Sequence, residues 1–145
     1  MEMTVKQLSV FIENREGRLG EVLDVLKKSE VNILSMSLAD TTEYGLLRLI
    51  VNDPEKGREA LTADGFSSMV SEVFVIKIPH KAGSLQEILA VISENKVNIE
   101  YMYGLSIDGE DATVVMKTND LEFAKEVMKK NNISVMTEEE IHAKQ

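Results

Sequence analysis

The feature that most constrains the fold of this chain is an internal repeat. Shifting the sequence by 66 positions aligns residues Asn14 to Ile33 with His80 to Ile99 without a gap. Chance supplies about one or two identities in such an alignment, whereas eight occur here. They pair Gly17, Leu19, Glu21, Leu23, Val25, Val31, Asn32 and Ile33 with Gly83, Leu85, Glu87, Leu89, Val91, Val97, Asn98 and Ile99. Two copies of one supersecondary unit are therefore expected, with domains at residues 1–70 and 71–145.

Each copy opens with the same succession of patterned segments. Alternating apolar residues predict a strand over residues 4–12 and another over 72–78. After a polar turn, apolar residues at helical spacing predict a helix through residues 19–26 and its counterpart through 85–92. Two strand-like runs then predict a hairpin in each copy, 31–40 with 44–51 and 97–107 with 112–118. An Asp-Gly pair within residues 108–111 supports a tight turn in the second hairpin.

A second helix and a final strand complete each copy. Asp53 and Pro54 suit the start of this helix in the first copy, and Asn119 or Asp120 suits it in the second. Gly65 predicts a left-handed residue at the end of the first of these helices. Final strands are expected within residues 66–70 and 133–137, and residues 138–140 indicate a solvated helix start. The order strand, helix, strand, strand, helix, strand predicts an α+β chain of two ferredoxin-like units, each an antiparallel sheet with both helices on one face.

Composition excludes several classes of function. The net charge of −9 repels phosphate backbones and anionic membranes, so neither nucleic acid nor a membrane is an expected partner. No cysteine is present, which rules out disulfides, thiolate metal sites and cysteine nucleophiles. Two histidines offer too few ligands for a histidine metal site, and neither metal nor cofactor is expected. The N-terminal residues resemble no export signal, so a cytoplasmic protein is expected.

The repeated turn carries the chemistry of interest. A helix start has free N–H groups and a partial positive charge, which suit a carboxylate. Gly17 and Gly83 lack a side chain, so a ligand can approach the backbone closely there. Asn32 and Asn98 open the next strand, and an asparagine amide can accept from an ammonium group and donate to a carboxylate. In this topology each asparagine need not lie beside the turn of its own copy.

The turn followed about 15 residues later by Val-Asn-Ile resembles the ACT domain, a small ligand-sensing module of amino-acid-metabolism enzymes. The resemblance covers nearly the whole chain as two copies. Glu16 and Ala82 stand where the family usually has proline, and a family histidine falls on Ile12. The resemblance implies ligand-binding residues at Asn14, Gly17, Arg18, Leu19, Asn32 and Ile33 in the first copy, and at His80, Gly83, Ser84, Leu85, Asn98 and Ile99 in the second.

From this resemblance we expect a regulatory protein without enzymatic activity that binds a small amino acid or a related metabolite between ACT-like units. The tandem layout is similar to stand-alone regulators of the acetolactate-synthase type. A homodimer presenting four units is expected, and its partner would be an enzyme of amino-acid metabolism.

Three alternatives stay open at this point. The glycines could be ordinary tight-turn residues, and the asparagines could make local hydrogen bonds. The chain could be an interaction module that binds no ligand. It could also be a small hydrolase such as an acylphosphatase, with Arg18 holding an anion and Asn32 positioning water, although Ser84 replaces the arginine in the second copy.

Overall fold

The computed structural model describes residues 3–13, 16–40, 44–79, 81–105 and 112–143. The chain divides into two compact units, which are described separately. The first-half unit consists of residues 6–71, and the second-half unit consists of residues 72–143 together with residues 3–5. The Asp-Gly turn predicted at residues 108–111 lies outside the described residues.

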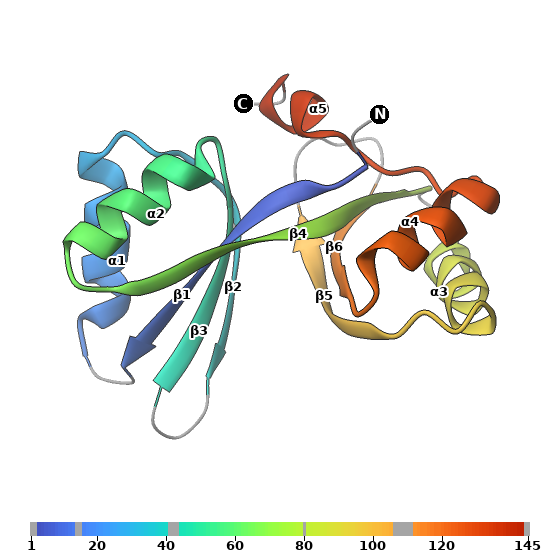
Figure 1. Ribbon diagram of the computed structural model, residues 1–145, viewed down its shortest axis with the longest axis horizontal. Coiled ribbons are helices and arrows are strands. Elements are labelled where there is room, and N and C mark those ends of the chain that lie inside the picture. Colours follow the sequence, from blue (N-terminus) through green and yellow to red (C-terminus); the bar gives the residue numbers. More distant parts are fainter. Residues whose placement is uncertain (1–2, 14–15, 41–43, 80, 106–111, 144–145) are drawn as a thin grey trace. The chain divides into compact units, whose positions relative to one another are not determined.

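The first-half unit has the predicted ferredoxin-like order (Figure 1). It contains β1 (Val5–Glu13), α1 (Arg18–Lys28), β2 (Ile33–Asp40), β3 (Tyr44–Val51), α2 (Pro54–Ala63) and the start of β4 (Ser67–Ile78). Its strands follow the neighbour order β2-β3-β1-β4. The antiparallel register sets Leu8 opposite Leu49 and Val10 opposite Leu47. Residues directly opposite share a sheet face, so these four side chains point to the same side.

That sheet face carries the core of the first-half unit. The four side chains are buried in one cluster with residues of both helices, Val22, Leu26 and Leu61 among them. Helices α1 and α2 therefore cover the same face of the sheet, as Figure 1 shows. Gly57 of α2 is part of this packing, because a Cβ there would come within 3.0 Å of a methyl carbon of Leu8. The apolar stripes predicted from the sequence are confirmed in this unit.

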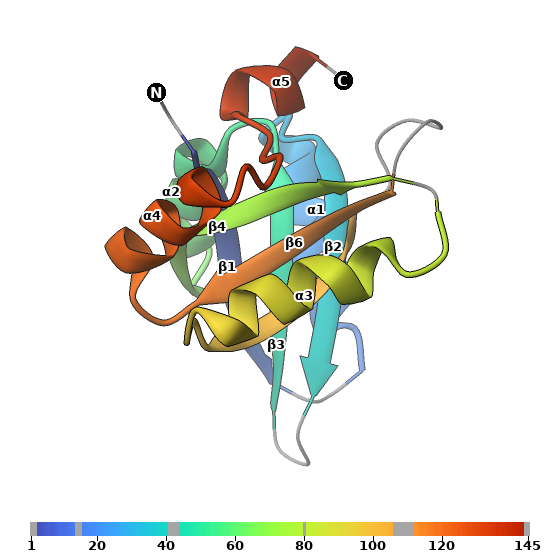
Figure 2. The same ribbon diagram turned by 90° about the vertical axis from the view of Figure 1, so that its right-hand side faces the viewer.

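The second-half unit repeats the arrangement. It contains the end of β4, α3 (Ser84–Glu94), β5 (Ile99–Leu105), β6 (Ala112–Thr118), α4 (Leu121–Lys130) and α5 (Glu138–Ala143), with strand order β4-β6-β5. Phe74 faces Met116 and Ile76 faces Val114 across β4 and β6. These side chains form a buried cluster with Ile92, Ala124, Val127 and Met128 of the helices. Figure 2 shows α3 and α4 on the same face of this sheet.

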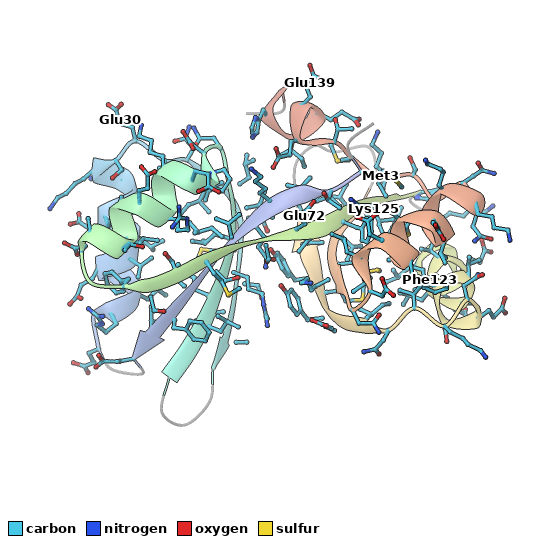
Figure 3. All side chains as sticks on the ribbon, viewed as in Figure 1. Met3, Glu30, Glu72, Phe123, Lys125 and Glu139 are labelled. Atoms are coloured by element: carbon cyan, nitrogen blue, oxygen red, sulfur yellow. The ribbon has the colours of Figure 1, made fainter. Side chains whose placement is uncertain are left out.

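Four helices end in the same way. The second residue past each C-cap donates its N–H to the carbonyl oxygen of the residue five positions earlier, at 2.9–3.2 Å; these bonds run from Val31 to Leu26, Phe66 to Leu61, Val97 to Ile92 and Ile133 to Met128. The residue before each donor has a positive φ, and these residues are Glu30, Gly65, Lys96 and Asn132. This is the Schellman motif, which satisfies the last helical carbonyls. Glycine suits its left-handed position, and the prediction for Gly65 is confirmed. Glu30, labelled at the end of α1 in Figure 3, adopts the same conformation despite its side chain.

The starts of α2 and α4 decide between the capping candidates. The Asp53 carboxylate accepts from the Lys56 N–H at 3.1 Å, with Pro54 as the first helical residue. In the second-half unit the cap is Asp120, whose carboxylate accepts from the Phe123 N–H at 3.3 Å. The Asn119 side chain therefore does not cap this helix.

The two predicted final strands differ in length. In the first copy the strand is complete, and it continues without a break into the opening strand of the second copy, so that both form β4. In the second copy it is reduced to a single bridge between Ile76 and Val135. Two backbone hydrogen bonds flank this bridge, from Lys77 to Ser134 at 2.9 Å and from Met136 to Val75 at 2.8 Å.

The helix start predicted at residues 138–140 is confirmed as α5, but Glu140 is not merely solvated. The Lys77 ammonium lies 3.0 Å from its carboxylate, and the Thr137 N–H donates to the same carboxylate at 3.1 Å. The Thr137 hydroxyl accepts from the Glu140 N–H at 3.1 Å, which completes a capping box. The hydrogen bond from Lys77, followed by the bond from Thr137, lowers the pKa of Glu140 below its ordinary value. Met136 and Ile141, on either side of this box, are buried.

Residues 3–5 belong to the second-half unit although they open the chain. The Thr4 hydroxyl donates to the Glu72 carboxylate at 2.7 Å, and Met3 packs against the second core cluster. Figure 3 labels Met3 and Glu72. Residues 3–5 therefore pack with the second half of the chain.

Candidate functional site

The two glycine turns have almost the same backbone. Gly17 precedes α1 with φ 84° and ψ −13°, and Gly83 precedes α3 with φ 86° and ψ −6°. A Cβ at either position would meet no atom of the described residues within 4 Å. Neither glycine provides a side-chain cap, so amides in the first turn of each helix are left without a side-chain acceptor. The structure confirms the left-handed backbone of both turns, while the approach of a ligand to it stays a prediction.

Arg18, which follows the first glycine, is already engaged. Its guanidinium lies 2.5 Å from the Glu21 carboxylate and 4.2 Å from the centroid of the Phe66 ring. Its Nε atom is buried and has no hydrogen-bond partner among the described residues. The guanidinium is therefore a cation stacked on an aromatic face.

Ser84, which follows the second glycine, makes a different environment. Ser84 is buried, and its backbone N–H donates to the Lys81 carbonyl oxygen at 3.1 Å. The leucines that come next also differ, because Leu19 packs against the first core cluster whereas Leu85 is exposed. The residue after the second glycine is therefore small and uncharged, unlike the arginine after the first.

Asn32 and Asn98 lie at the far end of the helix from the glycine of their own copy. Helices α1 and α3 each have 11 residues, which corresponds to about 16 Å. Each unit by itself therefore does not bring its glycine and its asparagine together. Ile33 and Ile99 follow the asparagines into β2 and β5, where Ile99 packs against the second core cluster and Ile33 is exposed.

Each of these asparagines is held by another asparagine that the sequence analysis did not assign to the site. The Asn32 N–H donates to the side-chain oxygen of Asn52 at 2.9 Å, and the Asn52 N–H donates to the Asn32 carbonyl oxygen at 3.1 Å. In the second-half unit Asn98 and Asn119 repeat both bonds, at 3.2 and 3.1 Å. A signal was present in the sequence, since Asn-Asp follows the hairpin in both copies.

Asn14 and His80, the remaining predicted site residues, lie outside the residues that the structure describes. The acylphosphatase alternative needs Arg18 and Asn32 together, but the structure places them at opposite ends of α1, with Arg18 paired to Glu21. Among residues 3–13, 16–40, 44–79, 81–105 and 112–143, no group of three or more His, Cys, Asp or Glu side chains could hold a metal ion. No helix in the described part of the chain is long and apolar enough to cross a membrane.

Comparisons with known proteins identify the family and the fold. A family model described as an ACT domain pair matches residues 3–144. No curated protein sequence matches. The crystal structure of protein BT0572 from Bacteroides thetaiotaomicron is 34% identical, with a TM-score of 0.90 over 97% of this chain and 96% of that one.

Two more distant structures share the fold. The ligand-free regulatory subunit of aspartate kinase from Thermus thermophilus is 15% identical, with a TM-score of 0.60 over 88% of this chain and 90% of that one. The corresponding subunit from Thermus flavus is 14% identical, with a TM-score of 0.61 over 89% and 93%.

Proposed function

The chain belongs to the family of ACT domain pairs, and from this premise we propose that it is a non-enzymatic regulator that binds a small amino acid or a related metabolite. The observation that carries the proposal is the pair of matched glycine turns. Both have a left-handed glycine at which a Cβ would meet no atom of the described residues within 4 Å, and a helix start without a side-chain cap from that glycine. A carboxylate fits such a place, because the first-turn amides and the helix dipole both favour negative charge.

The affinity expected of such a site suits a sensor. An amino acid of about nine heavy atoms, at roughly 0.6 kcal/mol per atom, binds with a Kd near 0.1 mM. Occupancy would then follow the concentration of a metabolite pool. Binding changes a protein's behaviour only where the ligand interacts more favourably with one arrangement of the units than with another. The regulated enzyme would respond to that arrangement.

A thermal-shift screen of the twenty amino acids at about 5 mM tests the proposal. At fifty times a Kd of about 0.1 mM, mass action stabilises the protein by about 2.3 kcal/mol, which raises Tm by several degrees. Asn32→Ala and Asn98→Ala are useful variants, because their backbone bonds to Asn52 and Asn119 do not require the altered side chains. A shift lost in one variant assigns the ligand to that asparagine. No shift with any amino acid would overturn the proposal in favour of an interaction module without a ligand.

The glycines allow a matched control. Gly17, Gly83 and Gly65 have φ of 84°, 86° and 88°, and a Cβ at any of them meets no atom within 4 Å in the part of the chain that the structure describes. Replacing each by alanine imposes the same backbone strain of about 1 kcal/mol. Only Gly17→Ala and Gly83→Ala should also weaken binding, as measured by isothermal titration. If all three variants bound the amino acid as tightly as the wild type, the glycine turns would not be part of the binding site.

We also propose a homodimer located in the cytoplasm. The support for dimerisation is β2, an edge strand of the first-half unit on which Met36 and Leu38 are 41% and 47% exposed. Exposed apolar edge strands commonly pair with another chain. Sedimentation equilibrium should give twice the mass of the 16.2 kDa chain, and Leu38→Glu should shift it toward the monomer. A wild-type monomer at micromolar concentration, with and without amino acids, would refute the dimer.

A further inference from the structure

The two asparagine pairs hold the backbone on both sides of a candidate ligand-binding residue. At Asn32 the preceding peptide unit donates to the Asn52 side chain at 2.9 Å, and the following unit accepts from the Asn52 N–H at 3.1 Å. Asn98 is held by Asn119 in the same way. Fixing both peptide units fixes the direction of the Cα–Cβ bond, so that side-chain torsions are the remaining freedom. Asn32 and Asn98 are nevertheless exposed, and a ligand can reach them.

The ends of the neighbouring helices do not depend on these side chains. Helix α1 is already terminated by hydrogen bonds from Glu30 to Lys27 at 3.0 Å and from Val31 to Leu26 at 2.9 Å. The start of α2 is capped by Asp53 rather than by Asn52. The same division holds in the second-half unit, where Asp120 caps α4. The side-chain oxygens of Asn52 and Asn119 therefore serve the backbone N–H groups of Asn32 and Asn98.

From this geometry we infer that Asn52 and Asn119 are positioning residues, which hold the amides of Asn32 and Asn98 ready for the ligand's ammonium and carboxylate groups. The inference rests on the proposed function. Its physical basis is preorganisation, because a side chain whose backbone is already fixed loses less entropy on binding. The corner between α1 and β2 and the corner between β3 and α2, which this bond joins, lie at the same end of the first-half unit (Figure 1).

The test compares two changes at each position with one shared control. Asn52→Ala removes the acceptor for the Asn32 N–H, whereas Asn52→Asp keeps an oxygen in its place. Asn119→Ala and Asn119→Asp repeat the pair in the second-half unit. Asn131→Ala is the control for general stability, because it removes a side-chain hydrogen bond of 2.9 Å to the Val127 carbonyl oxygen at the end of α4.

Two measurements are made on the full chain. Without ligand, NMR hydrogen exchange of the Asn32 and Asn98 amides should quicken only in the alanine variant of the same unit. With the amino acid that gives the largest thermal shift, titration should show about three- to tenfold weaker binding in at least one alanine variant, the fold-change expected when one side chain must be ordered on binding. The aspartate variant should restore the affinity, and Asn131→Ala should leave it unchanged.

The outcomes separate the two proposals. Faster exchange with unchanged affinity in both alanine variants would overturn the positioning role while leaving the proposed function intact. The positioning role would also be overturned if the aspartate variants did not restore the weakened binding, or if Asn131→Ala weakened binding to the same extent. If no amino acid binds the wild-type protein, the proposed function fails first and the positioning role falls with it, whereas the exchange data still report whether the bond holds the backbone.

Discussion

At Gly17 and Gly83 the backbone takes the same left-handed conformation, with φ of 84° and 86°, yet the residue after each glycine makes different contacts. Arg18 pairs with Glu21 and stacks on Phe66. Ser84 is small, buried and uncharged. The difference teaches that the fold fixes the course of the turn, because a strand must lead into a helix there, while the side chains around it are free to diverge. The two turns therefore present different side chains, and two ligand sites of the kind proposed above would differ accordingly.

The edges of the two units differ as well. In the first copy the last strand is part of β4, whereas in the second copy a single bridge at Val135 takes its place and α5 follows. Lys77 and Glu140 join α5 to β4, and no counterpart of this helix follows the last strand of the first copy, since the chain there continues in β4. At this edge the first-half unit is thus held by a full strand, whereas the second-half unit is held by one bridge and by side-chain contacts.

The largest expected effect tests whether the two units are separately stabilised by their cores. Leu26 and Ile92 occupy matching positions and are both fully buried. Leu26→Ala or Ile92→Ala should lower the free energy of unfolding by about 2–5 kcal/mol, because each leaves a cavity. Urea denaturation gives the loss, and hydrogen exchange should locate it in the unit that carries the change. Loss of protection spread equally over both units would show that they do not unfold separately.

A smaller effect concerns the side-chain difference between the turns. Arg18→Ser places the residue of the second turn in the first, and it should destabilise the protein by about 1–2 kcal/mol because a partly buried cation loses its aromatic contact. A double-mutant cycle with Phe66→Leu isolates that contact, with an expected coupling of about 0.5–1 kcal/mol. Additive effects of the two changes would mean that the stacking contributes nothing.

Substitutions at the helix ends, which have the same conformation in both copies, should raise the free energy of unfolding rather than lower it. Glu30 and Lys96 have φ of 59° and 62°, where side chains are strained and glycine is not. Glu30→Gly and Lys96→Gly should each raise the free energy of unfolding by up to about 1 kcal/mol, once the greater entropy of glycine in the unfolded chain is counted. Thermal unfolding measures the gain. A loss in either variant would show that its side chain makes contacts that outweigh the strain.

The smallest effect depends on pH and belongs to the second-half unit. Because its pKa is lowered on folding, Glu140 stabilises the protein above its ordinary pKa of 4.5, and this contribution is lost as pH falls through the lower folded value. The pair with Lys77 is partly exposed, so at most about 1 kcal/mol is expected. Glu140→Gln should be less stable than the wild type at pH 7 and should approach it below pH 4.5. A difference that persists unchanged to pH 3 would exclude the carboxylate as its source.

Much of the fold could be predicted from the sequence, because its signals are local. The 66-residue repeat, the alternation of the strands and the apolar spacing of the helices each depend on residues close together in the chain. The left-handed Gly65 and the cap at Asp53 are of the same kind. The ACT resemblance, confirmed by the family model over residues 3–144, rests on that local pattern too.

Other features required the tertiary structure, because they join residues far apart in the sequence. The partners of Asn32 and Asn98 lie 20 and 21 residues away. The aromatic ring that Arg18 stacks on belongs to Phe66, which follows α2. Val135 forms only one bridge although its sequence suits a strand, since strand length depends on the partner as well as on propensity. By itself the sequence determined the elements and their repetition. The packing of those elements decided which polar groups meet, because only packing brings such distant partners to the 2.9–3.2 Å of a hydrogen bond.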